Sequence, residues 1–226
     1  METITYDFDT KEVEWNPSYR QSYLNKIGWN DELLARISNM LITKDEFGNE
    51  IFRQEVFNPV TDTIEKLGML YLGRDMIAQD IRRFTDLGQT LVQFHLYHWF
   101  YDSVACLDSL ACLLNAHLKL DLDTRQIRLD KMFLKILKKS GSELAKTIEE
   151  DLVWIKELGD TRNSIIHREG RVVTGGGPEP CLMMDFQRMF TPTFDLNRVR
   201  IPNILDDYLK KVDALCLRVI SRMDRD

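Results

Sequence analysis

The pattern of apolar and polar positions changes near residue 60. Before that point, apolar and polar residues alternate in the stretches ITYDFD (4–9) and EVEW (12–15). Because successive side chains of a strand point to opposite faces, this alternation predicts a small hairpin or an extended arm. A short helix is expected over residues 29–41, and KDEFGNEIF indicates a turn around Gly48 and Asn49.

From Pro59 onward the apolar residues recur every three or four positions, which is the spacing of one helix face. The first helix carries Ile64, Leu67, Leu70, Tyr71, Ile77 and Ile81 on that face. The next helix, expected over residues 85–118, is apolar almost all round, which is typical of a central helix covered on several sides. Pro202 begins a last amphipathic helix, with apolar positions at Ile204, Leu205, Tyr208, Leu209, Val212, Leu215, Val219 and Ile220.

Between these helices, residues 140–159 predict a serine-capped helix that Gly159 ends. Asp160 or Thr161 then caps a new helix that carries RNSIIHRE and stops at Gly170. Beyond it, RVVTGGGPEPCLMMDF indicates two short extended runs around a glycine loop. The segment TGGGPEP lacks the Lys-Ser/Thr end of a phosphate-binding loop, so it is expected to be a turn.

These patterns predict an all-α protein, a helical bundle with a hairpin-like insertion after the motif helix. We expect an N-terminal arm over residues 1–58 and a helical domain over 59–226. The composition, 44% hydrophobic and 29% charged, is that of a globular protein. The longest uncharged run, 87–101, is shorter than the roughly 20 residues that span a bilayer, and no secretion signal is recognisable. A cytoplasmic protein without a membrane partner is therefore expected.

The four cysteines, Cys106, Cys112, Cys181 and Cys216, form no C-x-x-C pair. Their scatter argues against a zinc ribbon or a redox dithiol and favours small apolar fillers of the core. We expect no metal and no other cofactor.

The net charge of −6 gives no general attraction to nucleic acid, so such binding requires a local basic patch. Residues 127–139 supply one if they form a helix, because five cations then fall within an arc of roughly 100°. They are Arg128, Lys131, Lys135, Lys138 and Lys139, whereas Leu129, Met132, Phe133 and Ile136 occupy a different sector. Clustered cations of this kind suit an RNA backbone, although a solvated helix face is the commoner explanation.

The stretch GDTRNSIIHREG contains the pattern R-N-x-x-x-H. In a helix, Asn163 and His167 stand on one face, so the amide of Asn163 can orient the imidazole. Arg162 lies about 140° away from His167 around an ideal helix, but a place in the first turn and a long side chain give it reach. The free N–H groups of a helix start would help it to hold a phosphate.

An imidazole that titrates near neutrality beside such an arginine can cleave RNA without a metal. The imidazole moves the 2′-hydroxyl proton, and the guanidinium stabilises the charge on the phosphate oxygens. A histidine near a helix start often only caps or packs, so the pattern by itself does not establish catalysis.

The segment TRNSIIHRE, preceded by a helix ending in WIKELG and by a long apolar helix, resembles the signature of the HEPN superfamily. The members are compact α-helical domains with an R-x4-6-H motif near the start of a late helix. The resemblance extends from about residue 60 to about residue 222, and the motif is its only specific element. It implies a metal-independent endoribonuclease, often of toxin–antitoxin, anti-phage or RNA-processing systems, that dimerises so that two motifs share one cleft.

By this resemblance, Arg162 would stabilise the phosphate, His167 would be the acid and base, and Asn163 would orient the histidine. We also expect Arg168 to contact RNA. The implied partners are RNA, a second copy of the chain and, in toxin–antitoxin systems, an antitoxin or other protein. The chain departs from compact members in its first sixty residues and in the insertion at 171–190. Some relatives only bind, so a non-catalytic module for nucleotide, RNA or protein is the alternative.

A third hypothesis concerns His95, His98 and Asp102, whose spacing would place three metal ligands on one side of a helix. Their aromatic neighbours favour buried, hydrogen-bonded histidines instead, and no second helix offers matching E-x-x-H spacing. Asp102 and Asp108 are both candidates to face His167 across the bundle, and the sequence does not choose between them.

Overall fold

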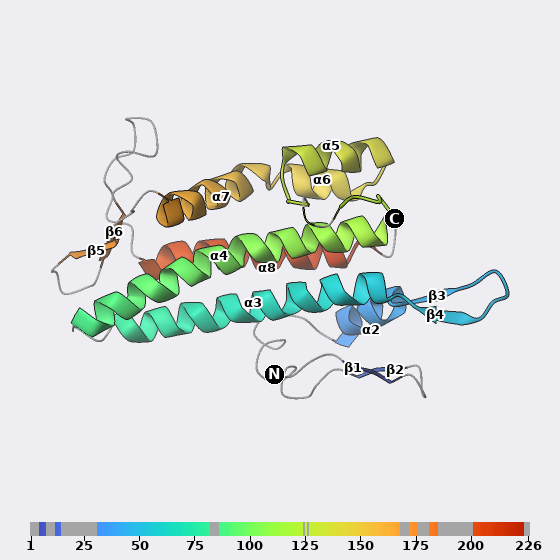
Figure 1. The fold of residues 1–226 in the computed structure, drawn as a ribbon, viewed down its shortest axis with the longest axis horizontal. Helices are drawn as coiled ribbons and strands as arrows, with labels where there is room; N and C mark the ends of the chain where they lie inside the picture. The colour runs from blue at the N-terminus through green and yellow to red at the C-terminus, as the bar shows by residue number, and fades with distance from the viewer. Residues whose placement is uncertain are drawn as a thin grey trace.

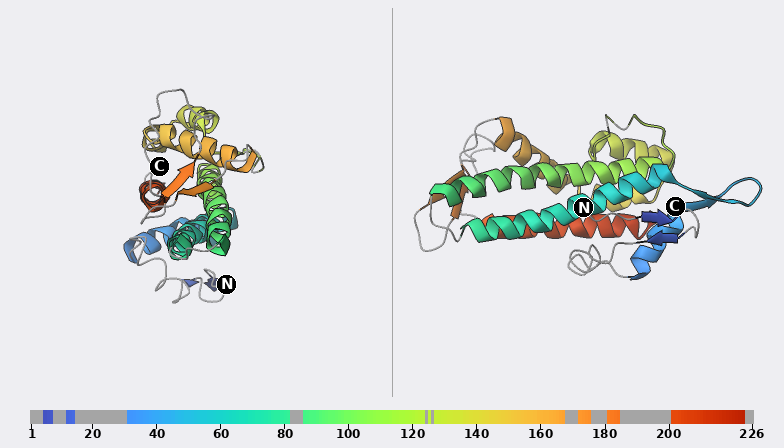
Figure 2. Two further views of the ribbon diagram at one scale, coloured as in Figure 1. Left: turned by 90° about the vertical axis from the view of Figure 1, so that its left-hand side faces the viewer. Right: turned by 60° about the horizontal axis from the view of Figure 1, so that its bottom comes forward.

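The computed structural model describes residues 5–7, 12–14, 31–81, 86–123, 125, 127–167, 172–175, 181–184 and 201–223. These residues are mostly helical, and their strands pair into small two-stranded sheets (Figure 1). The two longest helices, α3 (Gln54–Ile81) and α4 (Asp86–His117), run antiparallel along the molecule. Seen end on, α4 lies between α3 and α7 (Leu152–His167), with α8 (Ile201–Ile220) to one side (Figure 2).

The α3–α4 contact is closest where Trp99 covers Gly73. The Trp99 side chain is fully buried, and its indole N–H donates to the Leu70 carbonyl of α3 at 2.9 Å. A Cβ added to Gly73 would stand 3.1 Å from the Cδ1 atom of Trp99, so only glycine lets the two helices come this near. The core cluster continues from here to both ends of the pair.

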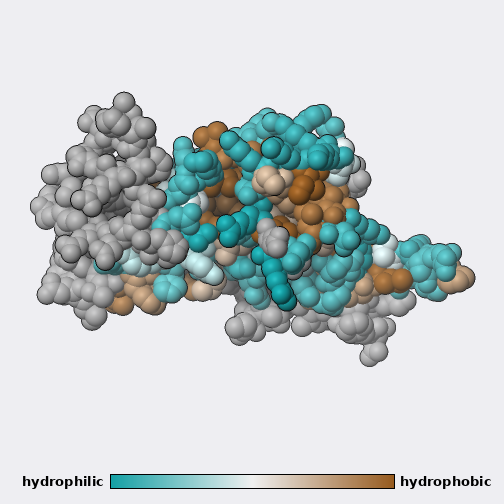
Figure 3. Space-filling model, turned by 45° about the horizontal axis from the view of Figure 1, so that its top comes forward, coloured by the Kyte–Doolittle hydropathy of each residue, from teal (hydrophilic) through white to brown (hydrophobic). Residues whose placement is uncertain are grey.

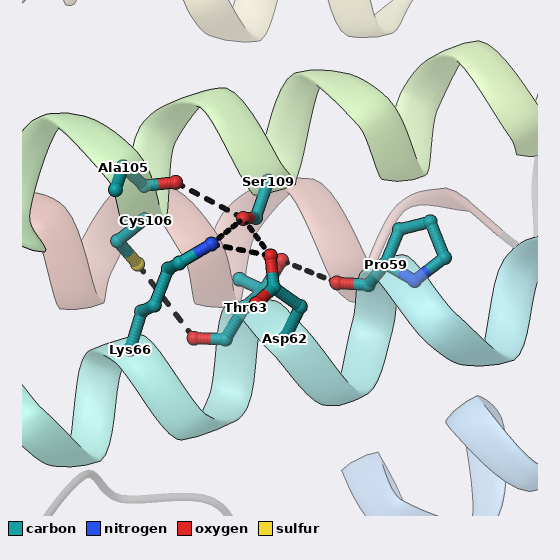
Figure 4. Close-up of polar contacts among 7 residues, drawn as sticks. All are labelled: Pro59, Asp62, Thr63, Lys66, Ala105, Cys106 and Ser109. Atoms are coloured by element: carbon teal, nitrogen blue, oxygen red, sulfur yellow. Dashed lines mark hydrogen bonds and ion pairs between the residues drawn. The ribbon is translucent and has the colours of Figure 1, made fainter. Parts of the chain in front are cut away.

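A polar cluster joins the same two helices further along (Figure 4). The ammonium group of Lys66 lies 2.5 Å from the Asp62 carboxylate and 2.8 Å from the Ser109 hydroxyl. The single O–H of Ser109 has two acceptors within reach, the Asp62 carboxylate and the Ala105 carbonyl. Every member of this cluster has a partner, which limits the cost of placing polar groups at a helix interface. The cluster therefore fixes the register of α3 against α4.

Helix α2 (Asp31–Met40) and the residue after it also contact this bundle. Helix α2 buries Ile37 in the main core, and Leu41 after it is equally buried. The predicted turn is confirmed: β3 (Ile42–Lys44) and β4 (Glu50–Phe52) form an antiparallel hairpin, and β1 (Thr5–Asp7) pairs with β2 (Glu12–Glu14) as the alternation predicted. Helix α3 begins at Gln54 and not at Pro59, so the predicted boundary between residues 58 and 59 lies inside a helix.

The region after α4 differs from the prediction in its boundaries. Helix α5 (Lys131–Ser140) begins at an Asp130 cap, four residues later than expected, and ends at Gly141 with φ of 80°. The helix predicted over residues 140–159 is two helices, α6 (Leu144–Glu149) and α7, because Asp151 interrupts it. The Asp151 carboxylate accepts from the Trp154 indole at 2.6 Å and pairs with Arg218 of α8.

The predicted hairpin after the motif helix is confirmed, since β5 (Val172–Gly175) pairs antiparallel with β6 (Cys181–Met184). Cys106 and Cys216 are buried free thiols, as expected of core fillers, whereas Cys112 is only half-buried. The side chain of Cys181 lies outside the described residues. In the part of the chain that the structure describes, no helix has the length and apolar character to cross a membrane.

Two helical glycines of this bundle, Gly73 and Gly159, should respond to alanine in opposite directions. Gly159→Ala should raise the free energy of unfolding by about 0.5–1 kcal/mol, because α7 is continuous there and nothing lies within 4 Å of the added Cβ. Gly73→Ala should lower it, because an overpacking cost of about 1–3 kcal/mol against Trp99 exceeds the gain in helix propensity. Urea denaturation of both variants measures the change in the free energy of unfolding. If Gly159→Ala destabilised the protein, α7 would not be a continuous helix at residue 159.

Candidate functional site

The R-N-x-x-x-H motif lies in the second half of α7 and not at a helix start. Helix α7 continues through Gly159, which does not have the positive φ of a helix-ending glycine. Buried Leu158 before it and buried Thr161 after it hold the segment helical, so packing overrides the local preference of glycine. The prediction that free N–H groups at a helix N-terminus would help Arg162 to bind phosphate is therefore wrong.

Thr161 anchors the first turn of the motif between neighbouring helices. Its side chain is 6% exposed, and its hydroxyl donates to the Glu157 carbonyl at 2.8 Å. The Tyr208 side chain of α8 hydrogen bonds to Thr161, and burial is the main cause that raises the pKa of Tyr208. The sequence identified Tyr208 only as an apolar position, so this contact across α7 and α8 was not predicted.

Arg162 is half-buried, and its Nε atom is buried without a hydrogen-bond partner. A buried N–H that makes no hydrogen bond costs about 1–3 kcal/mol. The charge of Arg162 reaches Asp108 of α4, where it acts to lower the pKa of that carboxyl group. Arg162 thus combines partial solvent access with an N–H group that lacks an acceptor.

Asp108 is the carboxylate that lies near the motif arginine. Burial raises its pKa, whereas a hydrogen bond from the Leu129 backbone N–H at 3.3 Å and the charges of Arg128 and Arg162 act against that rise. Burial also raises the pKa of Asp102. The charges that lower the pKa of Asp102 are those of His98 and Lys66, and Arg162 is not among them. Of the two, Asp108 is therefore the one that lies near the arginine of the motif. Which of them faces His167 is not tested, because the His167 side chain lies outside the described residues.

Of the other motif residues, the structure describes the side chain of Asn163 but not that of His167. Asn163 is exposed on the surface of α7, whereas Thr161 and Arg162 are on its more buried side. Position 167 ends α7 one turn after Asn163, but the side chain of His167 lies outside the described residues, as does the whole of Arg168. The structure therefore neither joins nor separates the guanidinium and the imidazole.

The basic patch predicted for residues 127–139 is exposed throughout. Arg128, Lys131, Lys135, Lys138 and Lys139 are all exposed, whereas Phe133, Leu134 and Leu137 are buried under α5. Met132 was expected on the apolar side, but 66% of it is exposed, because Phe133, Leu134 and Leu137 form the buried face of α5 and Met132 lies away from that face. Lys138 pairs with Glu149 of α6 at 2.5 Å.

The side of the molecule that carries α5, α6 and α7 is mainly hydrophilic, with apolar areas between the polar ones (Figure 3). Asp108 lies between the start of α5 and the motif in α7. Its carboxylate holds the Leu129 backbone, next to Arg128 and just before α5, and also lies near Arg162 of α7. One carboxylate of α4 therefore fixes the approach to α5 beside the arginine of the motif.

The histidines of α4 do not form a metal site in the described structure. His98 is exposed, contrary to expectation, and its Nδ1 atom lies 2.9 Å from the Phe94 carbonyl with its ring against the Phe94 ring. His95 is mostly buried, and its Nε2 atom lies 3.5 Å from a carboxylate oxygen of Asp80. No three His, Cys, Asp or Glu side chains among the described residues are grouped as metal ligands.

The described fold thus defines a mostly α-helical protein with a half-buried arginine, a nearby carboxylate and an exposed basic helix face. Comparisons of the chain with family models, with curated proteins and with solved structures found no match. Membership of the HEPN superfamily accordingly stays a prediction from the motif.

Asp108→Asn should change the dependence of stability on pH. Because burial raises the pKa of Asp108 in the folded chain, the folded state binds the proton more tightly than the unfolded state, and this carboxyl destabilises the fold as pH rises through its folded pKa. Asparagine keeps an acceptor for Leu129 without the charge. The Tm difference between Asp108→Asn and the parent should therefore grow in the variant's favour from pH 3 to pH 7, and a constant difference would contradict it.

Proposed function

We propose that the protein is a metal-independent endoribonuclease in which Arg162, Asn163 and His167 act on RNA. His167 removes the proton of a 2′-hydroxyl, and the 2′ oxygen attacks the adjacent phosphorus while the bond to the 5′ oxygen breaks. The departing oxygen takes up a proton. Arg162 stabilises the negative charge on the phosphate oxygens during this exchange, and Asn163 orients the imidazole.

The observation that carries the proposal is the missing hydrogen bond of Arg162 at its Nε atom. Its Nε N–H is buried without an acceptor, although the side chain is only half-buried. A phosphate oxygen is a strong acceptor for a guanidinium, so a bound strand would satisfy this group. Arginine is suited to this role because it stays charged and presents several N–H donors in one plane.

The exposed cations near α5 support RNA as the ligand. Five positive side chains lie on one helix and its approach, and Asp108 links that approach to Arg162. A chain with a net charge of −6 would otherwise repel a polyanion, so such a surface is needed for binding. We expect two copies of the chain to place their motifs at a shared cleft, as the resemblance implies.

A non-catalytic RNA-binding module is the second candidate. It is favoured by the place of Arg162 on the more buried side of α7, while Asn163 is exposed. Arginine and histidine positions five residues apart in a continuous helix are separated by about 140°. Within one subunit, the motif would then bind phosphate without aligning the imidazole on the same strand.

The catalytic prediction concerns cleavage of single-stranded and structured RNA in EDTA. Arg162→Ala and His167→Ala should each lower the cleavage rate by at least about 100-fold, because each removes a group with an effect of that order. An RNA with a 2′-deoxy nucleotide at the cleaved position should resist the parent protein. Cleavage is followed on end-labelled RNA by gel electrophoresis.

Lys146→Ala is the matched control, because Lys146 is exposed on α6 and pairs only at the surface with Glu143. It should cleave at the parent rate. Circular dichroism checks that each variant is folded. Equal cleavage by the parent and both motif variants would reject the proposal, and salt-sensitive binding without cleavage would favour the module.

The salt dependence of RNA binding tests the basic face separately. Lys131→Ala/Lys135→Ala should reduce the slope of log K against log salt concentration by about 0.7 for each phosphate that these lysines neutralise in the parent. The control Lys44→Ala/Lys146→Ala removes the same charge from other exposed positions and should leave the slope almost unchanged. Fluorescence anisotropy between about 50 and 200 mM salt, a range in which phosphate binding weakens strongly, measures it. Equal slopes for the two double variants would exclude α5 as the RNA-binding surface.

A further inference from the structure

A pocket lies between the first turns of α3 and the C-terminal end of α4. It has a volume of about 620 Å³, within the usual range for small-molecule sites. This is the end of the α3–α4 pair opposite to the end at which α7 finishes (Figure 1). Pro59, Ala116 and Leu122 give it an apolar part, and charged side chains lie beside them.

Two charged residues of this pocket adopt a backbone conformation that favours glycine. Lys119 has φ of 51° and Asp121 has φ of 56°, and they are the only non-glycine residues with positive φ in the described ranges. The other positive-φ positions of those ranges are occupied by Gly48 and Gly141. A side chain in this region is strained, so the chain has lysine and aspartate where glycine would be more stable.

The turn after α4 has the hydrogen bonds of a helix end that normally contains glycine. The Leu120 N–H donates to the Asn115 carbonyl at 3.0 Å, and the Lys119 N–H to the Ala116 carbonyl at 3.4 Å. The Asn115 side chain then holds the backbone of Leu122 by two bonds, of 3.1 and 3.2 Å. The strained residues are therefore carried on a fixed turn.

The pocket presents charges of both signs. Glu55 and Asp121 are carboxylates, and Lys119 is the cation among the lining residues. Burial acts to raise the pKa of Glu55, but hydrogen bonds from its own backbone and Arg53, with the charges of Arg53 and Lys119, lower it overall. Glu55 is therefore an anion at neutral pH, and Lys119 lies near enough to stabilise that charge.

From this cavity and its two strained charged residues we propose a binding site for a free α-amino acid, separate from the proposed ribonuclease site. The ammonium group of the ligand would interact with Glu55 and Asp121, and its carboxylate with Lys119 and the side-chain amide of Asn58. An apolar side chain of the ligand would contact Pro59, Ala116 and Leu122. The side chains of Glu55, Lys119 and Asp121 are exposed, so they pair with a ligand from the rim of the pocket; a zwitterion would interact with both signs at once, whereas a ligand with one charge would interact with only one of them.

The Lys119→Gly variant separates the effect of the left-handed backbone at this position from the effect of the lysine charge. It relieves the left-handed strain, so the variant should unfold at a Tm about 2–4 °C higher than the parent, as expected for a chain of this length. It also removes the cation of the site, so the ligand should no longer bind. If Lys119 had only a structural role, a more stable Lys119→Gly variant would still bind the ligand.

The experiment measures the Tm of the full chain with each of the twenty amino acids at millimolar concentration, and calorimetry follows for those that raise it. At least one should raise the Tm of the parent and of Lys119→Arg, which keeps the charge. The shift should disappear in Lys119→Gly and in Glu55→Gln, but persist in the Lys146→Ala control. No shift with any amino acid, or a shift retained in Lys119→Gly and Glu55→Gln, would overturn the proposal.

Discussion

The contact between α3 and α4 is the constraint on which the other elements depend. Trp99 lies against Gly73, and the interhelical bonds of Lys66, Asp62 and Ser109 fix the register further along. Because every other helix packs directly or through a neighbour on this pair, its register determines which α4 side chains point toward α7. Asp108, which directly precedes Ser109 of the polar cluster, is one of these, so the α3–α4 contact also determines which carboxylate lies near Arg162.

Helix α7 is held at its middle by buried groups and carries the motif toward its end. Thr161 and its hydrogen bond with Tyr208 fix the helix beside α8, and the next residue, Arg162, approaches α4. This arrangement fixes the backbone that carries Arg162. A fixed backbone reduces the conformational freedom that is lost when the side chain binds an anion.

Helix existence could be predicted from the sequence because apolar spacing reports burial directly, as in α4 and α8. Helix ends could not, since Gly159 is a helix-ending residue by local preference, but Leu158 and Thr161 are buried on either side of it. The exposure of Met132 was missed for another reason, because the buried face of α5 is formed by Phe133, Leu134 and Leu137. The basic residues and the motif were recognisable by type and spacing, whereas the place of Asp108 near Arg162 required the packing of α4 against α7.

The electrostatics around Arg162 favour an anionic ligand over a purely structural role. A structural arginine at a helix interface usually donates its N–H groups to carbonyls or to a carboxylate, because an N–H without an acceptor is costly. Here the Nε N–H makes no hydrogen bond, and Asp108 uses one oxygen for the Leu129 backbone. Burial moreover raises the pKa of Asp108, against the opposing effect of the charges of Arg128 and Arg162. The positive charge of Arg162 is thus only partly balanced within the chain, and a phosphate oxygen would complete both its charge balance and its hydrogen bonding.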